Sequence, residues 1–218
     1  NEYVDSSELM SSMGVTNILL MGVDNKNTNK STRSDSMILL SFDTVHGEVK
    51  LTSFMRDMYV YVPGYYNTKL THACQYGGPQ LTVDTIEYNF GIDIDGYVKI
   101  GYELLIELVD ALGGVTVAEI SSVESKALKK EGVSIEPGTD VHLDGNEALQ
   151  YCRIRKGQSD FQRTERQREV LTELINTAIK TSPTKLISIA TSLIEKVDSN
   201  ISKDEFMSLG FKALRCFT

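Results

Sequence analysis

The chain opens with short apolar runs separated by polar turns, a pattern typical of β-strands. The runs occupy residues 17–23, 37–42, 48–54 and 58–62. The first two are nearly continuous, which indicates buried strands, whereas the third alternates apolar and polar positions. We therefore predict a sheet in the N-terminal part of the chain, with a turn at His46-Gly47 before its third strand.

Helical spacing of apolar residues replaces this pattern further along. Pro79 favours the first turn of a helix. The inner stripe of that helix would contain Leu81, Ile86 and Phe90. The mostly polar residues 121–132 are expected to form a surface excursion. The other predicted elements are strands at 96–100 and 115–117 and helices at 103–112, 146–150, 160–180, 183–196 and 203–214.

Strands interspersed with helices and followed by a helical tail predict one α/β domain over residues 1–218, with helices packed on a mixed sheet. The composition agrees, because 218 residues with 41% hydrophobic content supply enough apolar material for a core. No apolar run approaches the roughly 18 residues of a membrane-spanning helix. Because the chain starts at Asn1 without an initiator Met, we expect a processed or excised portion, with any membrane anchor preceding it.

Charge is distributed unevenly. The net charge of −8 disfavours binding to nucleic acid and to anionic membranes. However, five of the eight arginines lie within residues 153–168, where six basic side chains face two acidic ones. That window carries +4 and leaves −12 for the rest of the chain. An acidic protein with one basic patch is expected to bind a particular anion there.

Two arginines of this window lie in an alternating segment, residues 151–155. If it is extended, Arg153 and Arg155 project to one side and Cys152 to the other. A solvated edge strand is the alternative interpretation of the pair. Cys152 between two arginines would have a lowered pKa and act as a nucleophile only if it faced them. We therefore expect it to be a small buried side chain, and the scattered cysteines and histidines predict no zinc site.

The helix predicted at 160–180 carries one arginine, Arg163, toward its buried side. Its apolar stripe includes Val170 and Leu174 and, extended toward the helix start, meets Gln167 and Arg163. A buried arginine needs either a carboxylate partner or an anion. The helix start, at Asp160, adds backbone N–H groups that favour an anion. Arg166 and Arg168 point further from the stripe and are expected at the surface.

Acidic residues occur at strand ends, where α/β folds bind ligands. Asp24 follows the first predicted strand, Arg33 and Asp35 lie just before the second, and Arg56-Asp57 follows the third. Together they suggest a phosphate chelate in which carboxylates hold Mg²⁺ and arginines clamp phosphate oxygens. For any single Asp, a loop cap with ordinary ion pairs is the better explanation, and only the combination favours the chelate. Walker, dinucleotide, serine-elbow and zinc-protease motifs are absent.

Several further segments lie in a consistent order between residues 17 and 167. They are Arg33-Ser34-Asp35-Ser36, Ser53-Phe54-Met55-Arg56-Asp57, Lys69-Leu70-Thr71-His72-Ala73, Tyr76-Gly77-Gly78, Gly113-Gly114-Val115, Leu143-Asp144-Gly145 and Asp160-Phe161-Gln162-Arg163. With them the chain resembles the LytR-CpsA-Psr family of cell-wall phosphotransferases. It departs from the usual family pattern at Phe54-Met55, where a proline often precedes the arginine, and at Cys74 and Cys152.

The resemblance implies a three-layer α/β/α sandwich with a mixed central sheet, held at the extracellular face of the cell membrane by a single N-terminal anchor. It implies transfer of a glycopolymer, such as teichoic acid or capsular polysaccharide, from a polyprenyl-pyrophosphate carrier to a peptidoglycan sugar hydroxyl. The partners would be the lipid-linked glycopolymer, peptidoglycan and the membrane, and not nucleic acid. A pyrophosphatase acting on the same lipid and a non-catalytic lipid-binding regulator are the alternatives.

The resemblance also implies roles for individual residues. Asp24 and Asp35 would serve the Mg²⁺ site, and either is a candidate base for the acceptor hydroxyl. Asp160 would orient neighbouring arginines. The residues expected around the pyrophosphate are Arg33, Arg56, Lys69, Arg153, Arg155, Arg163 and Gln167. The implied catalytic set is Asp35, Arg56, Arg153, Arg155, Asp160 and Arg163, and Arg33, Lys69 and Gln167 are the implied substrate-binding residues.

Overall fold

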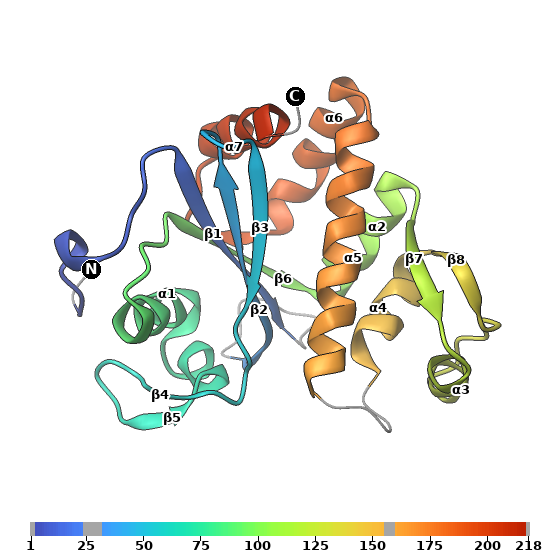
Figure 1. Ribbon diagram of the computed structural model, residues 1–218, viewed down its shortest axis with the longest axis horizontal. Helices are drawn as coiled ribbons and strands as arrows, with labels where there is room; N and C mark the ends of the chain where they lie inside the picture. Colours follow the sequence, from blue (N-terminus) through green and yellow to red (C-terminus); the bar gives the residue numbers. More distant parts are fainter. Residues whose placement is uncertain (1–2, 24–31, 155–159, 217–218) are drawn as a thin grey trace. The chain divides into compact units, whose positions relative to one another are not determined.

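A computed structural model describes residues 3–23, 32–154 and 160–216 (Figure 1). The chain forms two compact units. The first contains Asn1–Gly101 and Val197–Thr218, and the second contains Tyr102–Lys196. The prediction of one domain over residues 1–218 stays a prediction. No described helix is both long and apolar enough to cross a membrane.

The first unit is built on a five-stranded sheet with the order β3-β2-β1-β6-β9. The strands are β1 (Val15–Val23), β2 (Ser34–Asp43), β3 (Glu48–Ser53), β6 (Gly96–Gly101) and β9 (Asp198–Ser199). β1 pairs antiparallel with β2 and parallel with β6, so the sheet is mixed, as predicted. A 3₁₀ turn at Ser6–Glu8 precedes it.

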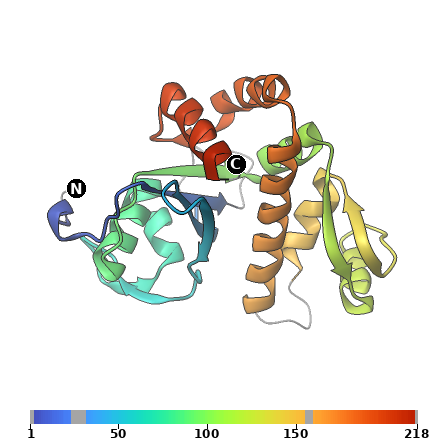
Figure 2. The same cartoon turned by 45° about the horizontal axis from the view of Figure 1, so that its top comes forward.

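Alternating side chains bury both faces of this sheet. Leu19 and Met21 pack with Ile86 of α1 (Thr71–Phe90) on one face. Ile18 on the other face packs in a cluster that includes Leu209 of α7 (Lys203–Cys216). Helix, sheet and helix thus form three layers, with α1 and α7 on opposite sides (Figure 2). The predicted α/β/α sandwich is confirmed.

Helix α1 consists of two parts. Gly77 and Gly78 have non-helical dihedral angles, and Gly78 has a positive φ of 71° that glycine adopts without strain. Pro79 then begins the second part, as predicted. The first part, from Thr71, was not predicted; it follows a small hairpin of β4 (Tyr59–Tyr61) and β5 (Asn67–Lys69).

The second unit packs helices against a two-stranded hairpin. Its elements are α2 (Tyr102–Leu112), β7 (Val115–Ile120), α3 (Ser122–Lys130), β8 (Gly138–Leu143), α4 (Gly145–Arg153), α5 (Asp160–Lys180), α6 (Pro183–Leu193) and a 3₁₀ turn at Ile194–Lys196. The core joins α2, β7, α3, α4 and α5 through side chains that include Val109, Val117, Leu128, Ala148 and Leu174.

Two expectations in this unit were wrong. Residues 121–132 contain α3, which begins with a capping box in which Ser121 and Glu124 satisfy each other's backbone N–H groups. The segment 151–155 is not extended over its first residues, because α4 continues through Arg153. Strand β8, paired with β7, was not predicted.

Candidate phosphate-binding site

A chain of ion pairs connects the start of β2 to the end of β5 in the first unit. Arg56 Nη1 donates to Asp35 Oδ1 at 2.6 Å, and Arg56 Nε lies 3.6 Å from Asp57 Oδ2. Lys69 Nζ lies 2.8 Å from Asp57 Oδ1. We call Arg33, Asp35, Arg56, Asp57 and Lys69 the Arg56 cluster. Four of its five members were predicted site residues, and the structure brings them into one region.

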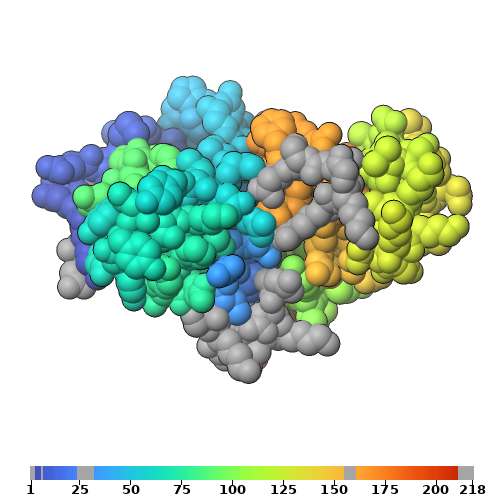
Figure 3. Space-filling model, turned by 90° about the horizontal axis from the view of Figure 1, so that it is seen from below, coloured from blue at the N-terminus to red at the C-terminus, as the bar shows by residue number. Residues whose placement is uncertain are grey.

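Backbone contacts hold these segments together. Thr71, at the start of α1, donates its hydroxyl to the carbonyl of Ser34 at 2.8 Å and its N–H to the carbonyl of Arg56 at 3.0 Å. The N–H of Leu70 donates to the carbonyl of Met58. The buried Thr71 therefore fixes the segments that carry Asp35 and Arg56 relative to each other. The hairpin and the start of α1, in teal, form a continuous part of one exposed face (Figure 3).

Arg33 and His72 extend the cluster along α1. Arg33 is exposed, and its Nε donates to Gln75 Oε1 at 3.0 Å. His72 Nδ1 is hydrogen-bonded to Thr68 Oγ1 at 2.8 Å. Burial lowers the pKa of His72, and the nearby charges of Arg33 and Lys69 lower it further, against an opposing effect of Asp57. No role was predicted for His72, although it lies in the family segment that starts at Lys69.

The charges of the Arg56 cluster suit a phosphate group. Its three cations, Arg33, Arg56 and Lys69, outnumber the carboxylates of Asp35 and Asp57. The side chains of Arg56 and Asp35 are 25% and 23% exposed, so they are reachable yet less screened than fully solvated groups. A guanidinium that is already oriented by one carboxylate loses less freedom when it binds an oxyanion. The arrangement can bind phosphate oxygens.

Of the two predicted Mg²⁺ ligands, the structure describes only one. Asp35 supplies a carboxylate, the oxygen ligand that Mg²⁺ prefers, and Asp24 lies outside the described residues. Within the described part of the chain, no three His, Cys, Asp or Glu side chains are grouped to hold a metal. Mg²⁺ is usually held by one or two carboxylates together with substrate phosphates, so a site with Asp35 fits that mode of binding.

Other predicted residues lie in the second unit. Arg163 is 4% exposed, which confirms its predicted place on the buried side of α5, and Gln167 is half-buried one turn later. Arg153 is exposed on the last turn of α4, with its guanidinium carbon 4.6 Å from the centroid of the Tyr102 ring. Arg155 lies outside the described residues. Asp160 begins α5, as predicted, and its side chain is not described.

Arg166 corrects the expectation of a surface residue. It is 4% exposed, donates from Nη2 to the carbonyl of Ile154 at 2.6 Å and from Nε to the carbonyl of Tyr151 at 3.1 Å, and pairs with Glu124. It thereby satisfies carbonyls at the C-terminal end of α4. The apolar stripe of α5 does not indicate this burial, because Arg166 is buried by its hydrogen bonds to the end of α4.

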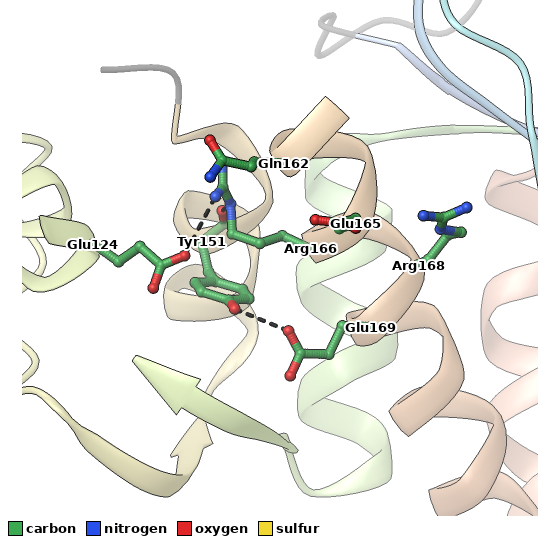
Figure 4. Close-up of a pocket in the computed structure, with 7 residues that line it drawn as sticks. All are labelled: Glu124, Tyr151, Gln162, Glu165, Arg166, Arg168 and Glu169. Atoms are coloured by element: carbon green, nitrogen blue, oxygen red, sulfur yellow. Dashed lines mark hydrogen bonds and ion pairs between the residues drawn. The ribbon is translucent and has the colours of Figure 1, made fainter. Parts of the chain in front are cut away.

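Tyr151 completes the same network. Its hydroxyl donates to Glu169 Oε2 at 2.9 Å, while Glu169 Oε1 accepts from the N–H of Ala118 (Figure 4). Burial raises the pKa of Tyr151, and the bond to Glu169 raises it further. These groups line an open pocket of about 390 Å³ whose charged residues have both signs, Glu124, Glu165, Arg166, Arg168 and Glu169. The network fixes α4 against α5.

Cys152 has no catalytic environment. Burial raises the pKa of its thiol to about 12, so the reactive thiolate is not populated near neutral pH. Cys152 packs in the core of the second unit with Ala148 and Val170. The prediction of a small buried side chain is confirmed.

Sequence comparison decides the family. The LytR_cpsA_psr family model matches residues 2–216, which is nearly the whole chain. The chain belongs to the LytR-CpsA-Psr family. As a LytR-CpsA-Psr protein, it carries the segments around Arg33, Arg56, Lys69 and Arg163 on which the resemblance was based.

Its curated relatives are named as transferases. The polyisoprenyl-teichoic acid–peptidoglycan teichoic acid transferase TagU of Oceanobacillus iheyensis is 34% identical over 212 residues, which cover 93% of this chain and 64% of the relative. The corresponding TagT of Bacillus subtilis is 39% identical over 166 residues, which cover 73% of this chain and 51% of the relative. This LytR-CpsA-Psr chain therefore spans less than two thirds of the length of either relative.

Solved structures of the family share the fold. TagT bound to LIIa-WTA is 32% identical with a TM-score of 0.81, covering 93% of this chain and 75% of that chain. TagT with bound octaprenyl pyrophosphate lipid is 31% identical with a TM-score of 0.75, covering 93% and 74%.

We predict that Arg166→Ala destabilises this LytR-CpsA-Psr protein by about 3 kcal/mol, because it removes the cation paired with the partly buried Glu124 carboxylate and a charged donor to the carbonyls of Tyr151 and Ile154. Arg168→Ala is the matched control, because Arg168 extends away from Glu124 (Figure 4). Urea unfolding measures both variants. Equal stability of the two variants would show that the Arg166 network contributes little.

We also predict that His72 titrates below the ordinary histidine pKa of about 6.5 in NMR spectra. Because the folded protein binds this proton less readily than the unfolded chain, His72 lowers stability as the pH falls through that range.

Inorganic pyrophosphate bound at the Arg56 cluster offsets the nearby cations and should raise the His72 pKa. Arg33→Gln should raise it as well, whereas Lys50→Gln, on β3, should not. An unchanged His72 pKa in saturating pyrophosphate would argue against anion binding at this place.

Proposed function

We propose that this protein is a phosphotransferase that moves a glycopolymer from a polyprenyl-pyrophosphate carrier to a peptidoglycan sugar hydroxyl. The observation that carries the proposal is the Arg56 cluster, in which Asp35 orients Arg56 beside two further cations. The names of TagU and TagT, and a TagT structure with bound octaprenyl pyrophosphate, support the same class of substrate.

The reaction follows from the charges involved. The acceptor hydroxyl oxygen bonds to the phosphorus that carries the sugar, and the bond from that phosphorus to the bridging oxygen breaks. Polyprenyl phosphate leaves with the bond's electrons. Such a transfer needs alignment and stabilisation of the phosphate oxygens more than covalent participation of the protein. Arg33, Arg56 and Lys69 are the described cations that perform this role in the first unit.

Asp35 has up to three functions in this proposal. One oxygen holds Arg56 in place, at 2.6 Å. Asp35 and Asp24 would also hold Mg²⁺, which, when bound, neutralises phosphate charge. Either carboxylate is the proposed acceptor of the hydroxyl proton. Arg153, Arg155, Asp160, Arg163 and Gln167 stay predicted members of the site, and a single membrane anchor would hold it at the extracellular face.

We predict that Arg56→Ala lowers the rate of transfer by at least about 100-fold, because it removes a donor to the oxygens on which charge develops. Arg56→Lys should retain part of the activity, since it keeps the charge but loses the bidentate geometry. Lys50→Ala, which removes an exposed cation of β3, should be fully active. Circular dichroism verifies that each variant is folded. Full activity of Arg56→Ala would refute the assignment.

The assay combines a polyprenyl-pyrophosphate-linked glycopolymer, peptidoglycan oligomers and Mg²⁺, and mass spectrometry identifies the products. Glycopolymer joined to peptidoglycan supports transfer. Free phosphorylated glycopolymer would instead identify a pyrophosphatase, in which water replaces the sugar hydroxyl. Tight binding of the donor without any product would identify a lipid-binding regulator. Chelation of Mg²⁺ should stop transfer.

A further inference from the structure

Tyrosines concentrate beside the Arg56 cluster. Six of the chain's ten tyrosines lie between residues 59 and 88: Tyr59, Tyr61, Tyr65, Tyr66, Tyr76 and Tyr88. Over this range, which the structure describes completely, every exposed large hydrophobic side chain is a tyrosine. Tyr65 and Tyr66 both contact Tyr76, and we call these three residues the tyrosine cluster.

Their rings are held in place by one another. Tyr65 stacks on Tyr76 with ring centroids 4.8 Å apart and an interplanar angle of 24°. The ring of Tyr66 lies 6.0 Å from that of Tyr76, and their hydroxyls are hydrogen-bonded at 2.8 Å. The Tyr65 hydroxyl donates to the carbonyl of Tyr76 at 3.3 Å. The cluster is therefore ordered before any ligand binds, which lowers the entropic cost of binding.

The loop that carries Tyr65 and Tyr66 is also fixed. Its two ends are joined by hydrogen bonds from the N–H of Tyr65 to the carbonyl of Val62 and from the N–H of Val62 to the carbonyl of Tyr66. Gly64 lies between them with a φ of 76°, which a tight turn requires. Even so, Tyr65 and Tyr66 remain 47% and 58% exposed. A rigid turn that presents two aromatic rings to solvent is typical of a binding surface.

The chemistry of this surface suits a sugar chain. A pyranose ring offers an apolar C–H face that packs on an aromatic ring, and hydroxyls at its rim that bond to polar groups. Tyrosine supplies both complements, and the neighbouring exposed side chains Asn67 and Gln75 add amides. A surface that docks on a membrane usually adds exposed leucine, phenylalanine or tryptophan side chains to its basic ones, and none of these is exposed over residues 59–88.

The tyrosine cluster is continuous with the Arg56 cluster. Gln75, next to Tyr76 in α1, accepts a hydrogen bond from Arg33. The ring of His72, which lies near Arg33 and Lys69, is 5.8 Å from that of Tyr76. In space-filling view the hairpin and the start of α1 form one continuous exposed area (Figure 3). A ligand on the tyrosines therefore lies next to the cations.

We infer that the tyrosine cluster is the docking surface for the glycan strand of the peptidoglycan acceptor. The inference rests on the proposed function, which requires an acceptor hydroxyl next to the pyrophosphate. The Arg56 cluster holds the donor through its pyrophosphate. The sugar backbone of the acceptor carries no phosphate group, so it needs a non-ionic surface. An open surface also admits the interior of a long chain, which an enclosed pocket does not.

The test is direct binding of a peptidoglycan tetrasaccharide, a strand fragment without lipid or phosphate, measured by calorimetry. Tyr65→Ala and Tyr66→Ala should each weaken binding about 5- to 10-fold. Tyr65→Phe should keep most of the affinity, because it keeps the ring. Tyr88→Ala is the matched control: Tyr88 is equally exposed on the same helix as Tyr76 but pairs with Tyr61. Binding of geranyl pyrophosphate, a probe for the donor, should be unchanged in all four variants.

Unchanged tetrasaccharide binding in both alanine variants would overturn the inference. An equal loss of tetrasaccharide affinity in Tyr88→Ala would also overturn it. If the alanine variants lost binding to phosphatidylglycerol vesicles but kept binding to the tetrasaccharide, the cluster would be assigned to the membrane instead. Because the measurement needs no turnover, it is independent of the transfer assay. Cluster variants that lose the tetrasaccharide in a protein without transferase activity would support the glycan surface while refuting the proposed function.

Discussion

The ion pair between Arg56 and Asp35 is the interaction on which the site depends. A pair that is about one quarter exposed contributes on the order of 1 kcal/mol or less to stability, so its importance lies in orientation. Asp35 holds the guanidinium of Arg56 in the first unit, where Asp57 links it to Lys69 and where Arg33 and Lys69 both lie near His72. Without this carboxylate, the arginine would lose its fixed direction and the cluster its geometry.

The sheet places the two partners. Strands β2 and β3 pair antiparallel with Ile38 opposite Ser53. Asp35 lies three residues before Ile38, and Arg56 lies three residues after Ser53, so the register brings them to the same end of the hairpin. β3 alternates exposed and half-buried side chains, and Val49 packs in the cluster of Ile18 and Phe42, so a slip of one residue would turn this half-buried row to solvent. Apolar residues far from the site thus determine its geometry.

Much of this was predictable from local pattern. The central strands, the three long C-terminal segments and the burial of Arg163 follow from periodicities of two and 3.6 residues. What failed depends on contacts between distant segments. Residues 151–153 alternate like a strand but are helical. Arg166, fifteen residues after Tyr151, donates a hydrogen bond to the Tyr151 carbonyl and so caps the C-terminal end of α4. The stacking of Tyr65 on Tyr76 and the environment of His72 likewise arise only when the hairpin folds onto α1.

The most direct test of the central claim is a crystal structure of the protein with geranyl pyrophosphate and Mg²⁺. We expect the pyrophosphate oxygens to lie within hydrogen-bond distance of Arg56 and Lys69, with Asp35 still bonded to Arg56. Pyrophosphate bound elsewhere on the protein, with the Arg56 cluster contacting only solvent, would contradict it.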